Sequence, residues 1–262
     1  MFNDEQMQQV FAEFWAALKQ NADRLKGHGF LQHADYKMDD RIRRFECGRF
    51  IQMADDYTSR LIGEVNYFLL NIAHADSWIQ VAQKHEQDER ISLLAEFADP
   101  LLELSVGRPY SLKNQVMFAA VQLLHRSNKL KSADWKDDLP PDDEIEFEQL
   151  EKVGVGWRKF KRFRKTMEKL NGKQFRITAT RDFRHVLQHR YRTHFGFGLT
   201  PLVKRDKTES GIIETDVMIP PLNLKTLLPE LYTQHKIAVE VFQAYWQLVN
   251  EICSEWDRRY AI

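Results

Sequence analysis

Apolar positions recur at steps of three and four along most of the chain, which is the period of an amphipathic helix. The first stripe covers 10–25 and follows Asn3 and Asp4, residues of the types that cap helices well. A second stripe covers 50–79 without a proline or an interior turn signal. The pattern therefore predicts a first helix of about six turns and then one long helix.

Helical patterning continues over 89–104 and 111–128. Pro100 is expected to kink or split the first of these helices, because proline lacks a backbone donor and clashes with the preceding turn. Gly107 and Pro109 predict a break between the two. The middle of the chain is therefore expected to be helical but interrupted.

The C-terminal half alternates between two periodicities. A helix is predicted over 157–170, where one face is apolar. The segment 198–219 predicts a β-hairpin of two short strands around a polar turn at 206–211. A heptad-like seam over 224–256 then predicts a long helix for bundle packing or dimerisation.

Together these elements predict an all-α fold, an up-and-down helical bundle of five to seven helices. A small β-hairpin is inserted before the long C-terminal helix. We divide the chain into an N-terminal helical half, 1–133, an acidic loop, 134–151, and a C-terminal helical half, 152–262. These three parts are expected to pack as one compact unit.

Composition places the chain among folded proteins, since 43% of its 262 residues are hydrophobic and 29% are charged. Its two cysteines are too few for a disulfide framework, and neither has a metal-ligand spacing. The sequence predicts no signal peptide and holds no run of about 18 apolar residues, so we also expect no membrane span and a cytoplasmic location.

Formal charge is zero overall, but it is distributed unevenly. The loop 134–151 holds nine acidic residues and one lysine, whereas 152–192 holds fourteen Lys and Arg residues against two acids. Cations without acidic neighbours repel one another, and a polyanion would relieve the repulsion. The alternative is a solvated helix face. The candidate nucleic-acid-binding residues are Arg158, Lys159, Lys161, Arg162, Arg164, Lys165, Arg190 and Arg192.

The acidic loop directly precedes this basic region. It is either a solvated loop or an internal cover that competes with a polyanion for the basic helix, and proximity decides between them.

The stretch 180–194 holds four arginines and three histidines at the borders of one apolar stripe. Histidine transfers protons near neutral pH and arginine binds phosphate, so the stretch favours phosphodiester chemistry. On a regular helix Arg184 and His189 lie about 140° apart, whereas Arg181, His185 and His189 share one face. The candidate catalytic residues are Arg184, His189, His185 and Arg181; the alternative is solvated charges at the borders of a helix. His185 and His189 lack a third metal ligand, so we expect no metal.

Arg184, the polar residue His185, three more residues and then His189 form a pattern that resembles the signature of the HEPN superfamily. The resemblance covers the C-terminal half. It implies a helical, metal-independent endoribonuclease without cofactors, in which the RNA 2′-hydroxyl attacks the adjacent phosphate while histidine relays protons and arginine stabilises charge.

The same resemblance implies a site shared by a homodimer and a setting in phage defence or as a toxin. It does not identify an antitoxin or regulator. The alternative is a non-catalytic helical module that binds nucleic acid or a partner protein through its basic face. A bundle that binds a small ligand is the third reading.

Overall fold

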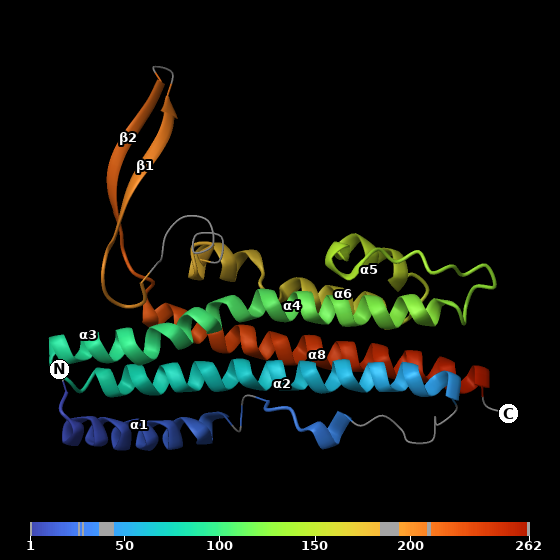
Figure 1. Ribbon diagram of the computed structural model, residues 1–262, viewed down its shortest axis with the longest axis horizontal. Coiled ribbons are helices and arrows are strands. Elements are labelled where there is room, and N and C mark those ends of the chain that lie inside the picture. The colour runs from blue at the N-terminus through green and yellow to red at the C-terminus, as the bar shows by residue number, and fades with distance from the viewer. Residues whose placement is uncertain are drawn as a thin grey trace. The chain divides into compact units, whose positions relative to one another are not determined.

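The computed structural model describes residues 2–25, 27, 29–36, 45–183, 194–208 and 211–260. Most of these residues are helical, and a two-stranded hairpin precedes the last helix (Figure 1). This arrangement confirms the predicted all-α fold with an inserted hairpin. The helices are α1 (Asp4–Leu25), α2 (Phe45–Ala82), α3 (Gln87–Leu93), α4 (Asp99–Asn128), α5 (Phe147–Gly154), α6 (Phe160–Lys169) and α8 (Leu224–Tyr260). Shorter helical turns are η1 (His33–Tyr36), η2 (Leu94–Ala98), η3 (Asp142–Glu144) and η4 (Gln174–Ala179).

The first helix begins where its capping residues predict. The Asn3 N–H donates to Gln6 Oε1 at 2.9 Å, and the Gln6 N–H donates to Asn3 Oδ1 at 2.9 Å. Each side chain therefore satisfies a backbone donor that a helix end would otherwise leave without a partner. This local exchange fixes the start of α1 independently of the rest of the chain.

The prolines interrupt the middle of the chain less than predicted. A π-helical turn, η2, ends at Ala98, two residues before Pro100, so the backbone hydrogen-bond pattern is already irregular next to the residue that lacks a donor. Pro109 lies inside α4, so the predicted break at Gly107 and Pro109 is wrong. Val106 and Leu112 on either side are both buried. Packing of such residues offsets the roughly 3 kcal/mol that an interior proline costs a helix.

The predicted acidic loop is only partly irregular. Its last residues belong to α5, whose start carries a capping box in which the Glu146 N–H donates to Gln149 Oε1 at 2.8 Å. Leu150 and Val153 of α5 are buried. The prediction of a loop throughout 134–151 is therefore wrong at its end, because a helix of two turns is too short to show a clear period.

The described chain divides into two compact units, each assembled from three separate stretches. Helices α2, α4 and α8 contribute residues to both units, so neither unit is a continuous part of the sequence. Unit 1 comprises Met1–Gly27, Leu69–Gly107 and Gly172–Thr233, and unit 2 comprises His28–Phe68, Arg108–Asn171 and Gln234–Ile262.

Unit 1 has an aromatic core. The ring of Phe14 stacks on Trp78 with centroids 4.3 Å apart, and Trp78 stacks on Phe97 at 4.2 Å. Beside them Asn21 Nδ2 donates to Ser77 Oγ at 2.9 Å inside the buried interface. This contact joins α1 to α2 and satisfies two polar groups that would be costly to bury alone.

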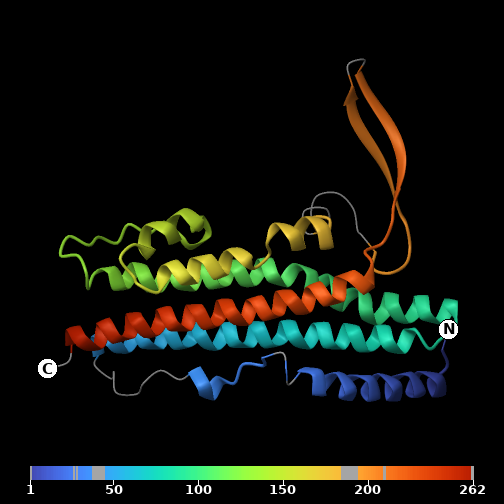
Figure 2. The same ribbon diagram turned by 180° about the vertical axis from the view of Figure 1, so that it is seen from behind.

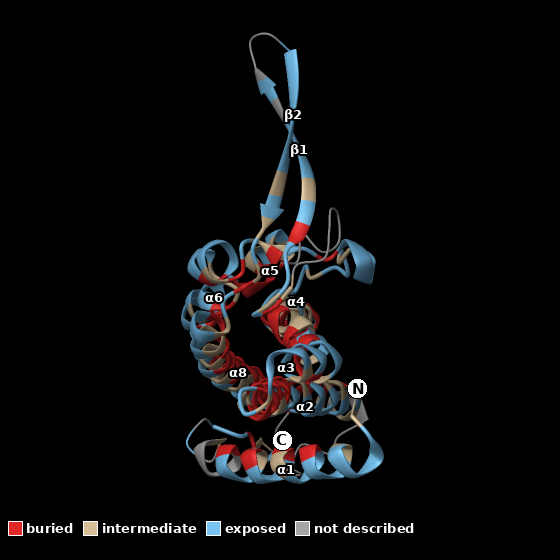
Figure 3. Ribbon diagram, turned by 90° about the vertical axis from the view of Figure 1, so that its left-hand side faces the viewer, coloured by how far each residue is buried: buried red, intermediate tan, exposed pale blue. Residues whose placement is uncertain are grey.

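The hairpin of unit 1 consists of antiparallel β1 (Thr200–Thr208) and β2 (Gly211–Ile219). Leu202 pairs with Val217, and both are half-buried near the base. Beyond them the described side chains of the hairpin are almost all exposed (Figure 3). The predicted hairpin at 198–219 is therefore confirmed, and it presents Val203, Ile212 and other apolar side chains to solvent.

Unit 2 is built on three helical segments, 45–68 of α2, 108–128 of α4 and 234–260 of α8, which run side by side (Figures 1 and 2). Phe50 stacks on Trp256 with ring centroids 4.8 Å apart, and Trp256 Nε1 donates to Ser127 Oγ at 2.9 Å. One residue of each helix therefore meets in a single buried contact.

The apolar seam of α8 is buried within this one chain. Phe242 and Tyr245 are fully buried, and Trp256 is 1% exposed. Of the two interpretations of the seam, the burial supports packing inside the bundle. The seam therefore gives no argument for a dimer.

Candidate functional site

Most of the predicted catalytic cluster lies outside the described residues. This holds for Arg184, His185 and His189, and for the predicted nucleic-acid contacts Arg190 and Arg192. Arg181 is the predicted catalytic residue that the structure describes.

The backbone leaves helical geometry at Arg181 and Asp182. Arg181 and Asp182 both have left-handed backbone conformations, with φ of 51° and 55°. Such values are strained for residues with a side chain and break the helical geometry. The predicted shared face of Arg181, His185 and His189 includes two residues outside the described part of the chain, so it stays a prediction.

Hydrogen bonds hold this left-handed pair in place. The Asp182 N–H donates to the Arg176 carbonyl at 2.6 Å, and the Arg181 guanidinium donates to the Pro220 carbonyl at 2.9 Å. Pro220 directly follows β2. Arg181 thus ties the end of η4 to the base of the hairpin.

The basic helix α6 buries one face against α8. Phe163 and Met167 are fully buried, and the ring of Phe163 lies 6.4 Å from that of Tyr245. The two helices run antiparallel, since the start of α6 contacts the region of Glu251 and its end contacts Gln234 (Figure 2). The apolar stripe that predicted this helix is therefore the face that anchors it.

Both ends of α6 are fixed by side chains of α8. The Glu251 carboxylate accepts the N–H of Arg158 at 2.9 Å and that of Lys159 at 2.8 Å. An anion at a helix N-terminus satisfies free donors and interacts favourably with the helix dipole. At the other end the Asn171 N–H donates to Gln234 Oε1 at 2.9 Å. The outer face of α6 is therefore held in one orientation.

That outer face carries cations that differ in their partners. Arg164 pairs with Glu151 and with Glu168, and Lys169 pairs with Glu240 at 3.6 Å. Other cations of this helix and the residues before it are exposed and form no ion pair with a described residue; they are Lys159, Lys161, Arg162 and Lys165, which we call the α6 cationic face.

The acidic segment before α5 contacts α4 and α5. Asp137 Oδ1 lies 2.8 Å from Nε2 of buried His125, Asp138 pairs with Lys152 at 2.7 Å, and Asp142 accepts from Gln122 at 2.9 Å. Lys152 also holds the pKa of the Asp138 carboxyl below its usual value, by a hydrogen bond and by its charge. These contacts direct the segment before α5 along α4, and of the predicted acidic loop Glu151 pairs with Arg164 of α6. The choice between a solvated loop and a cover for α6 stays open.

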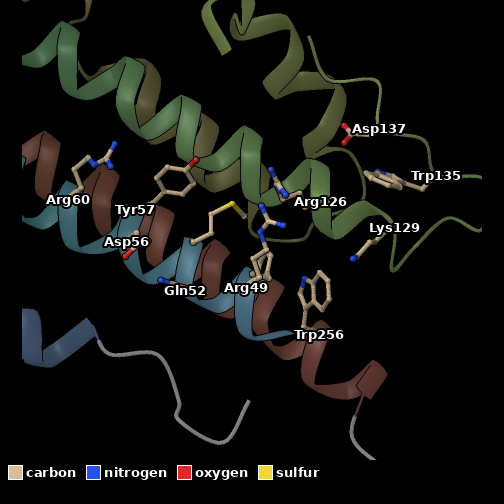
Figure 4. Close-up of a pocket in the computed structure, with 12 residues that line it drawn as sticks. Arg49, Gln52, Asp56, Tyr57, Arg60, Arg126, Lys129, Trp135, Asp137 and Trp256 are labelled. Carbon is tan, nitrogen blue, oxygen red and sulfur yellow. The ribbon is translucent and has the colours of Figure 1, made fainter. Parts of the chain in front are cut away.

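Sequence reasoning missed a pocket of about 540 Å³ in unit 2. It lies between α2, the end of α4, the loop after α4 and Trp256 of α8 (Figure 4). Its charged lining consists of four cationic side chains and two carboxylates; these are Arg49, Arg60, Arg126, Lys129, Asp56 and Asp137. The helical spacing of Arg49, Asp56 and Arg60 was the available signal, but it is also the pattern of an ordinary solvated helix face.

Aromatic side chains complete the pocket. Trp135 Nε1 donates to the His125 carbonyl at 2.9 Å, which fixes the indole, and Lys129 Nζ lies 4.7 Å from the centre of the Trp256 ring. Burial and then the charge of Asp142 raise the pKa of Tyr57, whereas Arg126 and Arg60 act to lower it. Both arginines line the same pocket as this phenol.

Among the described residues no group of three or more His, Cys, Asp or Glu side chains is arranged to hold a metal ion. No helix in the described part of the chain is both long enough and apolar enough to cross a membrane. The sequence matches no protein-family model, and comparisons with curated proteins and with solved structures find no similar protein.

Proposed function

We propose that this protein binds RNA along the α6 cationic face and cleaves it without a metal, using Arg184 and His189. RNA binding is proposed because the α6 cationic face has four exposed cations without ion-pair partners among the described residues. These cations lie on or next to a helix that is fixed at both ends. Like charges three and four residues apart destabilise a helix slightly, and a phosphate backbone removes that repulsion.

The fixed orientation favours a bound polyanion over a merely solvated face. A free helix would lose backbone entropy when its lysines bind a polyanion. Here that entropy is already lost, because Glu251, Gln234 and the buried Phe163 hold the helix in place. Lys161 and Lys165 are separated by one helical turn, about 6 Å along the axis. They can therefore contact one strand together. Contacts of this kind do not read sequence.

The cleavage half rests on the resemblance of Arg184, His185 and His189 to the HEPN signature. In this proposal His189 relays protons during attack by the 2′-hydroxyl, and Arg184 stabilises charge on the phosphoryl oxygens. His185 remains a second candidate for proton transfer. Arg181, whose guanidinium binds the Pro220 carbonyl, acts as a positioning residue. The defence or toxin setting belongs to the same proposal.

A homodimer that shares this site is also part of the proposal. Because the α8 seam is covered within the chain, the two copies would meet through another surface. Light scattering at tens of micromolar measures this directly. A monomer under conditions where RNA is cut would exclude a shared site.

Binding is tested with a triple variant, Lys161→Gln, Arg162→Gln and Lys165→Gln, in a fluorescence anisotropy titration with labelled single-stranded RNA. We expect roughly tenfold weaker binding and a shallower dependence on salt between about 50 and 200 mM, since each lost phosphate contact reduces the slope by about 0.7. The matched control changes three exposed lysines of unit 1, Lys19, Lys84 and Lys225, to Gln. Equal binding by the two triple variants would refute the assignment to α6.

Cleavage is tested with His189→Ala and Arg184→Ala in excess EDTA, with His194→Ala as the control from the same stretch outside the motif. Each motif variant should lose cleavage while circular dichroism shows an intact fold. If both cut RNA like the parent protein, the catalytic assignment is wrong. Cleavage that survives in these two variants but is lost in Arg181→Ala and His185→Ala would instead assign catalysis to that pair.

A further inference from the structure

We propose that the pocket of unit 2 binds a phosphate monoester that carries a flat aromatic ring, the chemistry of a ribonucleoside 5′-monophosphate. No residue of the α6 cationic face lines this pocket, and the proposal rests only on the described residues that do. It therefore does not depend on the proposed RNA binding or cleavage.

The charge of the pocket favours a phosphate. Arg49, Arg60 and Arg126 form no ion pair with any described residue, although two carboxylates line the same pocket. In Figure 4 the Arg49 side chain reaches from α2 toward Arg126 on α4. Two guanidinium groups directed at one space repel each other, and a dianion between them accepts hydrogen bonds from both in the bidentate geometry that arginine favours.

The two carboxylates do not neutralise this pair of arginines. Asp137 is engaged by His125, whose Nε2 lies 2.8 Å from it. Asp56 lies toward Arg60, at the end of the pocket away from Lys129 (Figure 4). A carboxylate accepts hydrogen bonds from hydroxyl groups, so Asp56 suits a ribose better than a phosphate.

Trp135 is the side chain that fits an aromatic ring. Its indole is half-buried. It is fixed because Nε1 donates to the His125 carbonyl and because the centroids of the Trp135 and His125 rings lie 5.2 Å apart. Trp256 is 1% exposed and already contacts the Phe50 ring and Lys129 Nζ, so its ring is not open to a ligand. Stacking of a base on a fixed indole accepts any of the four bases because each presents a π-face.

The size of the pocket agrees with this ligand class. A volume of about 540 Å³ lies in the range of small-molecule sites, which are mostly apolar or aromatic with a few convergent polar groups. A phosphate alone would use the arginines but would place no aromatic ring against the indole of Trp135. A nucleoside alone would leave the repulsion between Arg49 and Arg126 in place.

The test is isothermal titration calorimetry of the full chain with each of the four ribonucleoside 5′-monophosphates, and with adenosine and inorganic phosphate as separate probes. We expect at least one monophosphate to bind more tightly than either separate probe. Arg49→Gln and Arg126→Gln should each weaken that binding about tenfold or more, an effect of 1.4 kcal/mol or more. Trp135→Ala should weaken binding of the monophosphate but leave that of inorganic phosphate unchanged.

Two controls separate this result from the proposed RNA binding. Arg158→Gln removes an exposed cation outside the pocket and should leave binding of the monophosphate unchanged, as should the Lys161, Arg162 and Lys165 triple variant. Circular dichroism checks the fold of each variant; Arg49 and Arg126 are exposed, so their loss should not unfold the chain. The proposal is overturned if none of the four monophosphates binds at 1 mM, an affinity of about −4.1 kcal/mol. It is also overturned if Arg49→Gln and Arg126→Gln bind like the parent protein.

Discussion

Glu251 holds the N-terminus of α6, and its replacement by glutamine measures how much that contact stabilises the fold. The side chain of Glu251 is 6% exposed, and its two oxygens accept the N–H groups of Arg158 and Lys159. Glutamine has nearly the same shape but offers one carbonyl oxygen and places an NH₂ group against the second backbone donor. One hydrogen bond is therefore lost, and the negative charge at the helix N-terminus is lost with it.

The magnitude follows from these two losses. A hydrogen bond to a charged group contributes about 1.5–3 kcal/mol net, and a charge at a helix N-terminus roughly 0.3–1 kcal/mol, with overlap between the two. We count nothing for the ion pair of Glu251 with Arg158, because that arginine is 84% exposed and such pairs are screened by water. Glu251→Gln should lower the free energy of unfolding by about 2–3 kcal/mol. The melting temperature should fall by roughly 4–10 °C.

Urea denaturation followed by circular dichroism measures this change. The matched control is Glu255→Gln, one turn further along α8, whose carboxylate pairs with the exposed Arg258 on the same helix. Surface pairs of this kind contribute roughly 0–1 kcal/mol, so the control should unfold close to the parent midpoint. If Glu251→Gln is no less stable than Glu255→Gln, the contact does not anchor α6 as described.

Two further predictions concern packing and burial. Gly154→Ala should lower the free energy of unfolding, measured by urea denaturation, by about 1–3 kcal/mol, because the new Cβ would lie 2.3 Å from the Phe160 ring. The control Gly63→Ala should be neutral or stabilising, because its Cβ would meet no neighbouring side chain within 4 Å. Equal stability of the two variants would contradict this packing. Burial raises the pKa of the Cys253 thiol to about 12, so little of it is thiolate at about pH 8. In a Cys47→Ser variant, the native protein should therefore not react rapidly with a disulfide reagent, and one thiol should react after denaturation. A fast reaction of the native protein would show that Cys253 is accessible.

The sequence by itself determined the elements whose cause is local. Asn3 and Gln6 cap α1 through contacts three residues apart, and an unbroken apolar stripe marks α2. The same logic predicted which side of α6 is exposed, because burying Phe163 and Met167 turns the cations of the opposite side outward. The left-handed pair at Arg181 and Asp182 was not predictable, since neither residue type requires that conformation.

Tertiary structure decided the features that depend on distant residues. Helix α4 passes through Pro109 where the sequence predicted a break, and buried residues on both sides of it supply the packing that offsets the local cost. The choice between a dimer and internal packing for the α8 seam depends on which helix faces it, which the seam alone does not encode. The pocket is the clearest case, since Arg49, Arg126 and Trp256 belong to three different helices. Periodicity fixes the face on which a side chain lies, but only long-range packing fixes which faces meet.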